Sequence, residues 1–512
     1  MIYNNQVFGE HLLVGDWFLK WRTNFSVTER DEPDNRQVRY LVQDGVFTLE
    51  DLSGSGSRDF YFLDEDVADY AVDLMIPFNP FDMPDTDPLD IARIQPEQKI
   101  QFGATYTFRD RSFDGRRLRF RARGLNDING DPIDLTLPPE QIFSPDNLNP
   151  DGIVLIETTR PTDSYAAEQT LAAAYGMVDI KVHPRVRMQA GVRVESSNQE
   201  VETFALFGVP PDVIRAELDE TDFLPALNLT FDLTRYDSAD LENERLGTPF
   251  KRDPKMQLRL AASQTVSRPE FRELAEFQFT DVAEGFAARG NPDLDRALIQ
   301  HLDLRWEWFP NPAEVISVSA FAKTFDSPIE RVIIPTGSSL ITSWEDAESG
   351  ELFGLEFEIK KRLENLGFAD VPFLRNIAIQ TNLAVIESEV EIDSSNTTVV
   401  QTNSKRPLQG QPDYTFNLGI LYENLKQQLQ AGFFVGSFGK TISGVGAFGL
   451  PDTEEQPRFD VDFKISKRFG ASAVSLSVEN ILNDRFQIEQ GPFVISERKT
   501  GIAVGVSYSY TF

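Results

Sequence analysis

The last twelve residues of the chain, residues 501–512, alternate large apolar side chains with small or polar ones. Because successive side chains of a strand point to opposite faces, this segment would form a strand with one continuous apolar face. A closing strand in a soluble core is one interpretation. The other is a membrane-spanning strand, since small polar side chains suit a wet lumen and aromatic residues at a strand end suit the membrane interface. The apolar face carries Ile502, Val504, Val506, Tyr508, Tyr510 and Phe512.

Length and composition leave room for a membrane barrel and exclude other classes of protein. With 512 residues, the chain is either several soluble domains or one large closed sheet. No run of about 18 apolar residues occurs, so no transmembrane helix is expected. The mean hydropathy of −0.30 agrees with strands that have one polar face. The net charge of −32 repels nucleic acid, which we exclude as a partner. The absence of cysteine excludes disulfides, thiolate zinc sites and cysteine nucleophiles.

The same alternation recurs along the chain and predicts an all-β, antiparallel transmembrane β-barrel. Residues 458–467 and 471–479 form a predicted hairpin around Phe469-Gly470. Residues 301–308 alternate an apolar face with an ionisable face, which we expect to be a polar row in the lumen. The ionisable face is His301, Asp303, Arg305 and Glu307, and the apolar face is Leu302, Leu304, Trp306 and Trp308. About seventeen strands are expected, near residues 2–10, 16–29, 59–77, 98–123, 163–182, 184–206, 220–235, 254–268, 301–308, 314–323, 350–364, 373–392, 411–424, 427–439, 458–467, 471–479 and 499–512.

The predicted connections alternate between short and long, as in outer-membrane barrels with short periplasmic turns and longer extracellular loops. Counting back from a last strand that descends to the periplasm puts the short turns on the periplasmic side. Residues 78–97 and 236–253 break the rule, because they are long yet fall on that side; they are either miscounted or extended turns. The short turns are residues 12–15, 183–184, 309–313, 424–426 and 469–470, and the long loops are residues 30–58, 124–162, 269–295, 326–349, 393–410, 440–455 and 481–498.

Several segments together resemble the barrel of TonB-dependent outer-membrane receptors. Each segment is weak alone, but their order over most of the chain is specific. The resemblance implies active import of a scarce ligand, such as a siderophore, cobalamin or a glycan, energised by TonB from the inner membrane. The segments are residues 223–230 (FLPALNLT), 258–274, 289–294 (RGNPDL), 406–411 (RPLQGQ), 477–483 (SVENILN) and the aromatic C-terminus, with weaker signatures at residues 9–11 and 31–34.

The sequence departs from that family at its start. Members of the family begin with a signal peptide, a TonB box and a plug domain that fills a barrel of about 22 strands. Residues 1–5 show neither a basic n-region nor an apolar h-region, and no stretch before the first strand could form a plug. We therefore expect residues 1–512 to be the C-terminal portion of a receptor barrel, without plug domain or signal peptide. An unpaired barrel edge is costly in lipid, which favours a truncated chain over a natural plugless one.

The sequence predicts neither a catalytic site nor a metal site. The three histidines, His11, His183 and His301, are far apart in sequence and match no zinc-binding spacing. Residues 127–131 begin like a calcium loop, but Pro138 stands where a bidentate Glu would be needed, so a turn closed by an Asp side chain is expected. No nucleophile elbow or phosphate-binding loop is present. We therefore expect no enzyme activity and no cofactor; His301 is either a ligand contact or part of a polar network in the lumen.

Ligand contacts are expected in the loop of residues 269–295, where phenylalanines are interleaved with Arg and Asn. Aromatic and Arg side chains supply binding energy in partly dry pockets. Alternatively, the phenylalanines pack the loop onto itself or onto a plug. Tryptophans at strand ends are expected to anchor the barrel at the lipid interface, with stacking platforms for a sugar as the alternative. The ligand candidates are Phe277, Phe279, Phe286, Arg289 and Asn291, and the interface and assembly candidates are Trp306, Trp308, Tyr508, Tyr510 and Phe512.

Two functions remain open at this point. One is an energised receptor and transporter in the outer membrane of a Gram-negative bacterium, of which this chain is the barrel. The other is a passive porin, which needs no plug and closes with about 16 to 18 strands. The expected partners are outer-membrane lipid, the barrel-assembly machinery that reads the aromatic C-terminus, the TonB complex acting through a plug, and a surface lipoprotein over the loops. A barrel enzyme is disfavoured because no pair of nucleophile and base stands out.

Overall fold

The computed structural model describes residues 1–50, 55–78, 98–160, 162–183, 185–204, 213–234, 255–280, 287–311, 313–335, 340–392 and 401–511. Strands dominate, and the described helices are single turns: α1 (Pro139–Ile142), α3 (Phe271–Leu274), and the 3-10 turns η1 (Leu363–Leu366) and η2 (Leu374–Asn376). Among the described residues, no helix is long and apolar enough to cross a membrane.

Seventeen long strands pair in chain order, each antiparallel to the next. This confirms the prediction of an all-β chain with about seventeen antiparallel strands. They are β1 (Ile2–Leu12), β2 (Phe18–Gln37), β5 (Ser57–Pro77), β6 (Lys99–Ala122), β8 (Ser164–His183), β9 (Val186–Phe204), β10 (Ile214–Asp232), β11 (Lys255–Ser267), β14 (Ala297–Phe309), β15 (Val315–Asp326), β18 (Ser349–Arg362), β19 (Ile377–Glu391), β21 (Tyr414–Asn424), β22 (Leu429–Phe438), β25 (Arg458–Phe469), β26 (Ser472–Glu479) and β29 (Ala503–Tyr510). Two short strands, β7 (Ile153–Glu157) and β20 (Lys405–Arg406), add to β6 and β19 and bring this sheet to nineteen strands.

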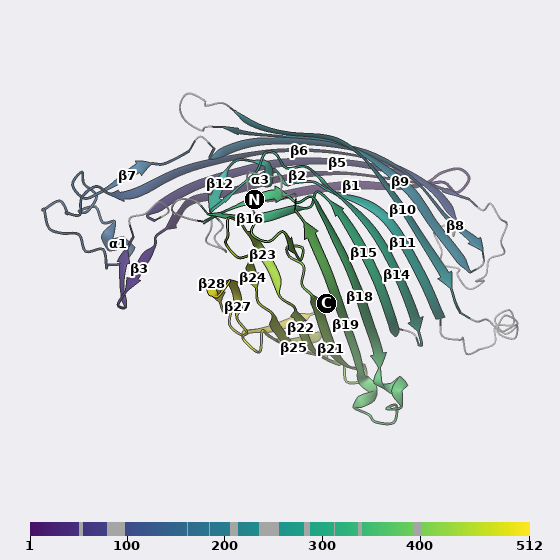
Figure 1. Ribbon diagram of the computed structural model, residues 1–512. Helices are drawn as coiled ribbons and strands as arrows, with labels where there is room; N and C mark the ends of the chain where they lie inside the picture. Colours follow the sequence, from purple (N-terminus) through teal and green to yellow (C-terminus); the bar gives the residue numbers. More distant parts are fainter. Residues whose placement is uncertain are drawn as a thin grey trace, which may run out of the picture.

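The sheet curls into a deep arch (Figure 1). Directly opposed residues of antiparallel neighbours share a face, so the register carries each strand's alternation across the sheet. On β14, Leu304 lies opposite Leu260 of β11 and Ala320 of β15, whereas Arg305 lies opposite Arg259 and Ser319. The convex face therefore collects apolar side chains and the concave face collects polar ones. Large apolar residues are widely exposed on the convex face, which is expected of a lipid-facing wall and not of a surface in water.

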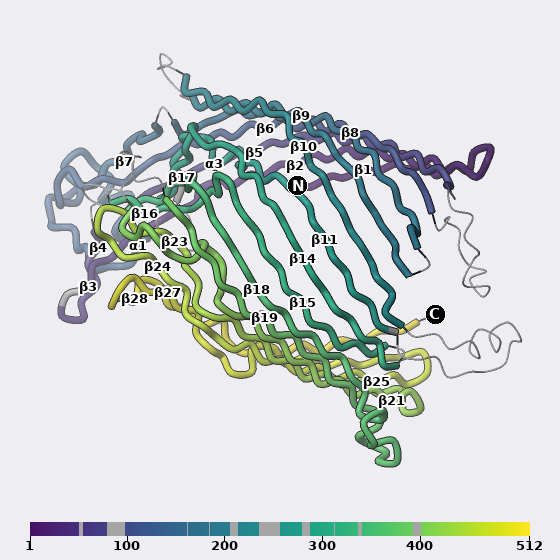
Figure 2. The backbone as a smooth tube through the Cα atoms, turned by 45° about the vertical axis from the view of Figure 1, so that its right-hand side comes forward, coloured from purple at the N-terminus to yellow at the C-terminus, as the bar shows by residue number. Residues whose placement is uncertain are grey.

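One end of the arch carries the short turns and the other the long connections, and we call these the short-turn end and the loop end (Figure 2). A two-residue hairpin joins β25 to β26, where Gly470 adopts a φ of +62° that suits glycine. The two long connections that broke the predicted alternation do lie at the short-turn end, since β5 ends at Pro77 and β6 begins at Lys99, and β10 ends at Asp232 and β11 begins at Lys255. The strand ends thus place both connections at the short-turn end, as counted from the sequence. Most of their residues, and Pro184 of the predicted turn 183–184, lie outside the described part.

A second sheet of eight strands at the loop end was not predicted from the sequence. Its strands come from the connections that were expected to be loops, and we call it the loop sheet. Two parallel pairings, β13 with β17 and β16 with β23, join strands from different connections. In Figure 1 the loop sheet lies under the arch. Its strands are β12 (Gln278–Thr280), β13 (Ala287–Arg289), β16 (Ile329–Pro335), β17 (Leu340–Asp346), β23 (Thr441–Gly446), β24 (Thr453–Glu455), β27 (Phe486–Gln490) and β28 (Phe493–Arg498); a separate hairpin contains β3 (Tyr40–Gln43) and β4 (Val46–Leu49).

The first and last strands of the arch each have one neighbour. Within the described residues, β1 pairs with β2 only and β29 with β26 only. Most residues of β1 and all residues of β29 are exposed. The seventeen strands therefore form an open wall whose two edges carry unpaired backbone groups.

A buried carboxylate joins two neighbouring turns at the short-turn end. Glu314, just before β15, accepts hydrogen bonds from Asn311 Nδ2 (2.7 Å), Lys361 Nζ (2.6 Å), the backbone N–H of Arg362 (2.9 Å) and Asn365 Nδ2 (2.9 Å). Burial alone would raise the pKa of Glu314, but these hydrogen bonds outweigh burial and lower the pKa to about 2.

Replacing Glu314 by Gln should therefore destabilise the protein by about 1–3 kcal/mol at neutral pH, since it removes charge-assisted bonds from a buried site. The folded pKa lies below the unfolded value of about 4.3, so the contribution is fully present above that value and is lost as pH falls toward about 2. Urea unfolding in detergent at several pH values measures the difference. Glu364→Gln in the adjacent turn is the control, because Glu364 is more exposed and its pair with Arg362 is worth at most about 1 kcal/mol. A Glu314→Gln effect that persists unchanged at the lowest pH would contradict this account.

Candidate ligand-binding site at the loop end

Residues 268–296 connect β11 to β14, and we call this segment the strap. Its described residues, 268–280 and 287–296, lie against the concave face of the wall. Arg268 and Arg296, its first and last residues, bind the same buried carboxylate on β10: Arg268 Nη2 lies 2.5 Å from Asp222 Oδ2, and Arg296 Nε lies 2.6 Å from Asp222 Oδ1. Arg268 Nη1 also binds Glu195 Oε2 of β9 at 2.8 Å. Both ends of the strap are thus fixed to one point of the wall by charge-assisted bonds.

The first half of the strap is a packed cluster. Phe271 and Leu274 of α3 and the nearby Phe277 are buried against wall residues that include Tyr165 and Val201. Each buried phenylalanine contributes about 1.5–3 kcal/mol through its removal from water. The cluster therefore buries Phe277, a predicted ligand contact, between the strap and the wall.

Aromatic and cationic contacts orient this cluster on β6. The ring centroid of Phe277 lies 4.7 Å from that of Phe113, and the guanidinium of Arg109 lies 4.6 Å from the centre of the Phe271 ring. Such ring pairs and cation–π contacts add to the burial of apolar area. The concave face of β6 thus supplies both a ring and a cation to the strap.

The second half of the strap joins the loop sheet. Arg289 at the end of β13 is partly exposed, and its Nη1 lies 3.7 Å from Glu276 Oε1. Gly290 follows because a Cβ there would lie 2.1 Å from the carbonyl oxygen of Ala275. Asn291 Nδ2 donates to the carbonyl oxygen of Trp344 on β17 at 2.9 Å, so this predicted ligand contact connects the strap to the loop sheet. For the other two candidates, the backbone of Phe279 pairs with Ala288, and Phe286 lies outside the described residues.

Carboxylates gather where the strap meets β17. Burial, together with the charge of Asp295, raises the pKa of Asp346 to about 6, although Asp346 Oδ2 accepts the backbone N–H of Asp295 at 2.9 Å. Burial and the charges of Asp346 and Asp293 also raise the pKa of Glu345, against the opposing influence of Arg289. Arg289 is therefore a cation among carboxylates, and an anionic group that approached it would compete with them.

A buried ion pair connects the loop sheet to the wall. Arg406 of β20 binds Glu330 of β16 through two bonds, Nη1–Oε1 at 2.8 Å and Nη2–Oε2 at 2.5 Å, and both side chains are 2% exposed. Gln409 adds two hydrogen bonds to this connection. Its backbone N–H donates to Glu330 Oε1 at 3.2 Å, and its Nε2 donates to the carbonyl oxygen of Ser443 at 2.8 Å. Arg406 and Gln409 belong to the segment RPLQGQ, which the sequence singled out by resemblance without indicating this role.

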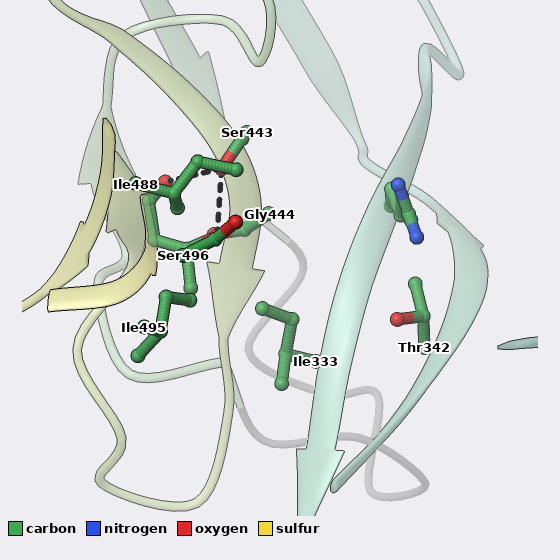
Figure 3. Close-up of a pocket in the computed structure, with 9 residues that line it drawn as sticks. Ile333, Thr342, Ser443, Gly444, Ile488, Ile495 and Ser496 are labelled. Carbon is green, nitrogen blue, oxygen red and sulfur yellow. Dashed lines mark hydrogen bonds between the residues drawn. The ribbon is translucent and has the colours of Figure 1, made fainter. Parts of the chain in front are cut away.

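The cavity inside the loop sheet is small. It lies between the β16–β17 hairpin and the strands β23, β24, β27 and β28 (Figure 3). Its volume of about 10 Å³ fits about one water molecule, whereas small-molecule sites span about 300 Å³ or more. Ser443 Oγ donates to Thr453 Oγ1 at 3.0 Å and closes one side of it. A ligand would therefore meet the outer surfaces of the strap and the loop sheet, and not this cavity.

A sequence profile described as "TonB dependent receptor-like, beta-barrel" matches residues 7–483. The chain belongs to the TonB-dependent receptors. No curated protein matches the sequence. The resemblance read from the sequence is therefore confirmed at the level of the family.

Solved structures of TonB-dependent receptors share the fold at low identity. The siderophore receptor PiuA from Acinetobacter baumannii is 10% identical with a TM-score of 0.59, over 99% of this chain and 64% of that chain. The pyoverdine receptor FpvA from Pseudomonas aeruginosa PAO1 is 13% identical with a TM-score of 0.58, over 100% and 62%. The copper transporter OprC is 10% identical with a TM-score of 0.58, over 100% and 66%. The chain spans between 52% and 66% of the length of such structures.

The polar row that the sequence placed in the lumen of this TonB-dependent receptor lies on the concave face of β14. Arg305 donates to Glu307 Oε1 at 2.9 Å and to Glu358 Oε2 of β18 at 2.6 Å. His301 Nε2 lies 2.8 Å from Thr265 Oγ1 of β11, and Asp303 is exposed. No group of three or more residues suited to hold a metal ion occurs within the described ranges. The row is a network of cross-strand bonds that binds three strands together.

The predicted interface residues of the receptor occupy the convex face at the short-turn end. Trp306 and Trp308 are partly exposed, and Tyr508 and Tyr510 are exposed on β29. Phe512 lies outside the described residues. The aromatic side chains at this end are thus placed where a membrane interface would meet the wall.

Removing Arg406 should cost about 3–5 kcal/mol, because Glu330 would be left as an uncompensated buried charge. We expect Arg406→Met to unfold the loop sheet at lower temperature and to expose it to protease, while the double variant Arg406→Met/Glu330→Leu recovers most of the loss. Lys405→Met is the matched control, because the adjacent Lys405 pairs with Glu389 on the surface and such pairs are worth about 0–1 kcal/mol. Equal stability of Arg406→Met and Lys405→Met would show that the buried pair does not hold the loop sheet.

Proposed function

We propose that this chain is the wall and mouth of an outer-membrane receptor that takes up a scarce ligand with energy from TonB. The observation that carries the proposal is the family match across residues 7–483, combined with a strap and a loop sheet fixed under the arch at the loop end. Among the similar structures, PiuA is described as a siderophore receptor, FpvA as a pyoverdine receptor and OprC as a copper transporter. A siderophore, cobalamin or a glycan is the class of ligand proposed here, and no catalytic step is proposed.

We further propose that the wall is one part of a larger barrel. The unpaired edges of β1 and β29 support this, since an edge in lipid leaves backbone groups without partners. The greater length of the similar receptors supports it as well. In this proposal additional strands complete the barrel, a plug domain fills it and contacts TonB, and a surface lipoprotein is a further candidate partner over the loops. A passive porin that closes with these seventeen strands has less support, because β1 and β29 do not pair with each other in the described residues.

The aromatic C-terminus is proposed to guide assembly through the barrel-assembly machinery. Replacing Tyr510 and Phe512 by Ser should strongly reduce the amount of folded protein in the outer membrane without affecting synthesis, because these residues would anchor the last strand at the interface. Heat-modifiable migration of outer-membrane fractions measures folding. Phe493→Ser is the control, since Phe493 is an equally exposed aromatic residue in the loop sheet. Normal levels of folded double variant would rule out the assembly role.

Arg289 is the residue proposed to contact ligand, because it is a partly exposed cation in the strap. In the receptor encoded by the complete gene, Arg289→Ala should weaken ligand uptake at low concentration roughly tenfold, the loss expected for one charge-assisted bond. Arg485→Ala is the matched control, an exposed loop-end arginine that pairs with Glu497. Uptake is measured with labelled ligand in cells with and without TonB, and the amount of folded protein is checked in parallel. Uptake that does not require TonB, with steady conductance in planar bilayers, would favour the passive channel.

A further inference from the structure

The turn between β18 and β19 differs from its neighbours at the short-turn end. Residues 363–376 contain η1 and η2 and form the longest of the turns at this end that the structure describes completely. The turn projects beyond the ends of the strands as a green segment at the bottom of Figures 1 and 2. The turn takes no part in the contacts described above for the strap and the loop sheet, so its length needs a separate explanation.

Large apolar side chains are exposed throughout this turn. Leu366 is 54% exposed, Phe368 40%, Val371 42% and Phe373 61%. A turn that faces water normally presents polar residues, and a cluster of exposed apolar ones marks contact with a membrane or another protein.

A ring contact shows which face of the wall the turn approaches. The rings of Phe373 and Tyr422 stack with centroids 5.1 Å apart and planes 24° apart. Tyr422 of β21 lies opposite Ile377 of β19, on the convex face that also carries Ile420. The turn therefore folds toward the apolar, lipid-facing side of the wall and away from the concave side where a plug would lie.

The base of the turn is rigid. Glu314 accepts hydrogen bonds from Lys361, the backbone N–H of Arg362 and Asn365, which begin the turn. These bonds fix the start of the turn relative to the wall, which lowers the entropy cost of placing the turn against a surface.

Charges of both signs accompany the apolar residues, since the turn itself contains Glu364, Asp370 and Arg375. Arg375 is exposed in the turn, and Lys426 is exposed in the next turn beside Leu425, which is 80% exposed. One turn further, the ammonium of Lys467 lies 5.8 Å from the centre of the exposed ring of Phe469. Exposed apolar side chains next to charged ones match the interface between the headgroups and the acyl chains of a leaflet.

We propose that residues 363–376, with Leu425 and Phe469, form an anchor that inserts into the headgroup region of the phospholipid leaflet at the short-turn end. This inference rests on the proposed membrane placement and goes beyond the uptake function. The anchor would fix the depth and tilt of the wall on one side of the barrel. A periplasmic protein as the occupant is the alternative that the experiment must separate.

The absence of cysteine allows a direct test with single spin labels. The full chain is folded into vesicles of phosphatidylcholine, with or without about one third phosphatidylglycerol. Phe368→Cys carries the label in the turn, Phe357→Cys on the convex face of β18, and Phe493→Cys in the loop sheet. Collision rates of each label with oxygen, which concentrates in lipid, and with a water-soluble nickel complex are measured by electron paramagnetic resonance.

The label at position 368 should show a several-fold higher ratio of oxygen to nickel collisions than the label at 493, in vesicles with and without phosphatidylglycerol. A lipid-exposed label at 357 with a water-exposed label at 368 would overturn the anchor alone. Water exposure at both positions would overturn the membrane placement and the anchor together. Nickel access at 368 that is lost only when periplasmic extract is added would assign the turn to a protein partner and likewise refute the anchor.

Discussion

Backbone hydrogen bonding between successive antiparallel strands is the interaction on which the rest of the structure depends. Each of the seventeen strands pairs with its neighbours in chain order, so nearly every backbone N–H and C=O of the wall is satisfied locally in the sheet. That condition makes a β-wall possible in lipid, where no water replaces a missing partner. It also fixes the register, and the register decides which side chains face the concave side. The strap and the loop sheet depend on this outcome, because their anchor points are concave-face residues.

Buried carboxylates near the loop end pair with arginines and so join the wall to its connections. Asp222 of β10 binds both ends of the strap, and Glu330 of the loop sheet binds Arg406 of β20. A buried carboxylate is costly unless it is paired, so each of these acids requires an arginine at a defined position beside it. The same rule explains why the mouth has a defined shape although it is built from connections between strands. Residues of the strap and the loop sheet, which the sequence assigned to loops, are thus fixed by buried ion pairs.

The sequence predicted the wall well because the signal is local. Period-two alternation within residues 301–308 is enough to place Leu304 and Arg305 on opposite faces, and a two-residue turn with Gly470 is enough to close a hairpin. The loop sheet depends on contacts between distant segments. Ala287 pairs in parallel with Ile341, and Val332 pairs in parallel with Val445. The residue pattern within one of these segments does not predict which distant segment it pairs with. Phe277 looked available for a ligand because its partners, Phe113 and Tyr165, lie more than a hundred residues earlier in the chain.

The shared clamp on Asp222 links the strap to the register of β10. A slip of β10 by one residue would turn Asp222 to the lipid side and release Arg268 and Arg296 together. A change at Asp222 would therefore weaken both ends of the strap at once, although Glu195 also binds Arg268 and Glu220 also binds Arg296. The shared clamp also means that the span between the two arginines is set by the wall and not by the length of the strap. Between the two arginines, the packing of Phe271 and Leu274 on the wall and the bond from Asn291 to the carbonyl oxygen of Trp344 set the rest of the path, so the wall and the loop sheet together determine where the described part of the strap lies.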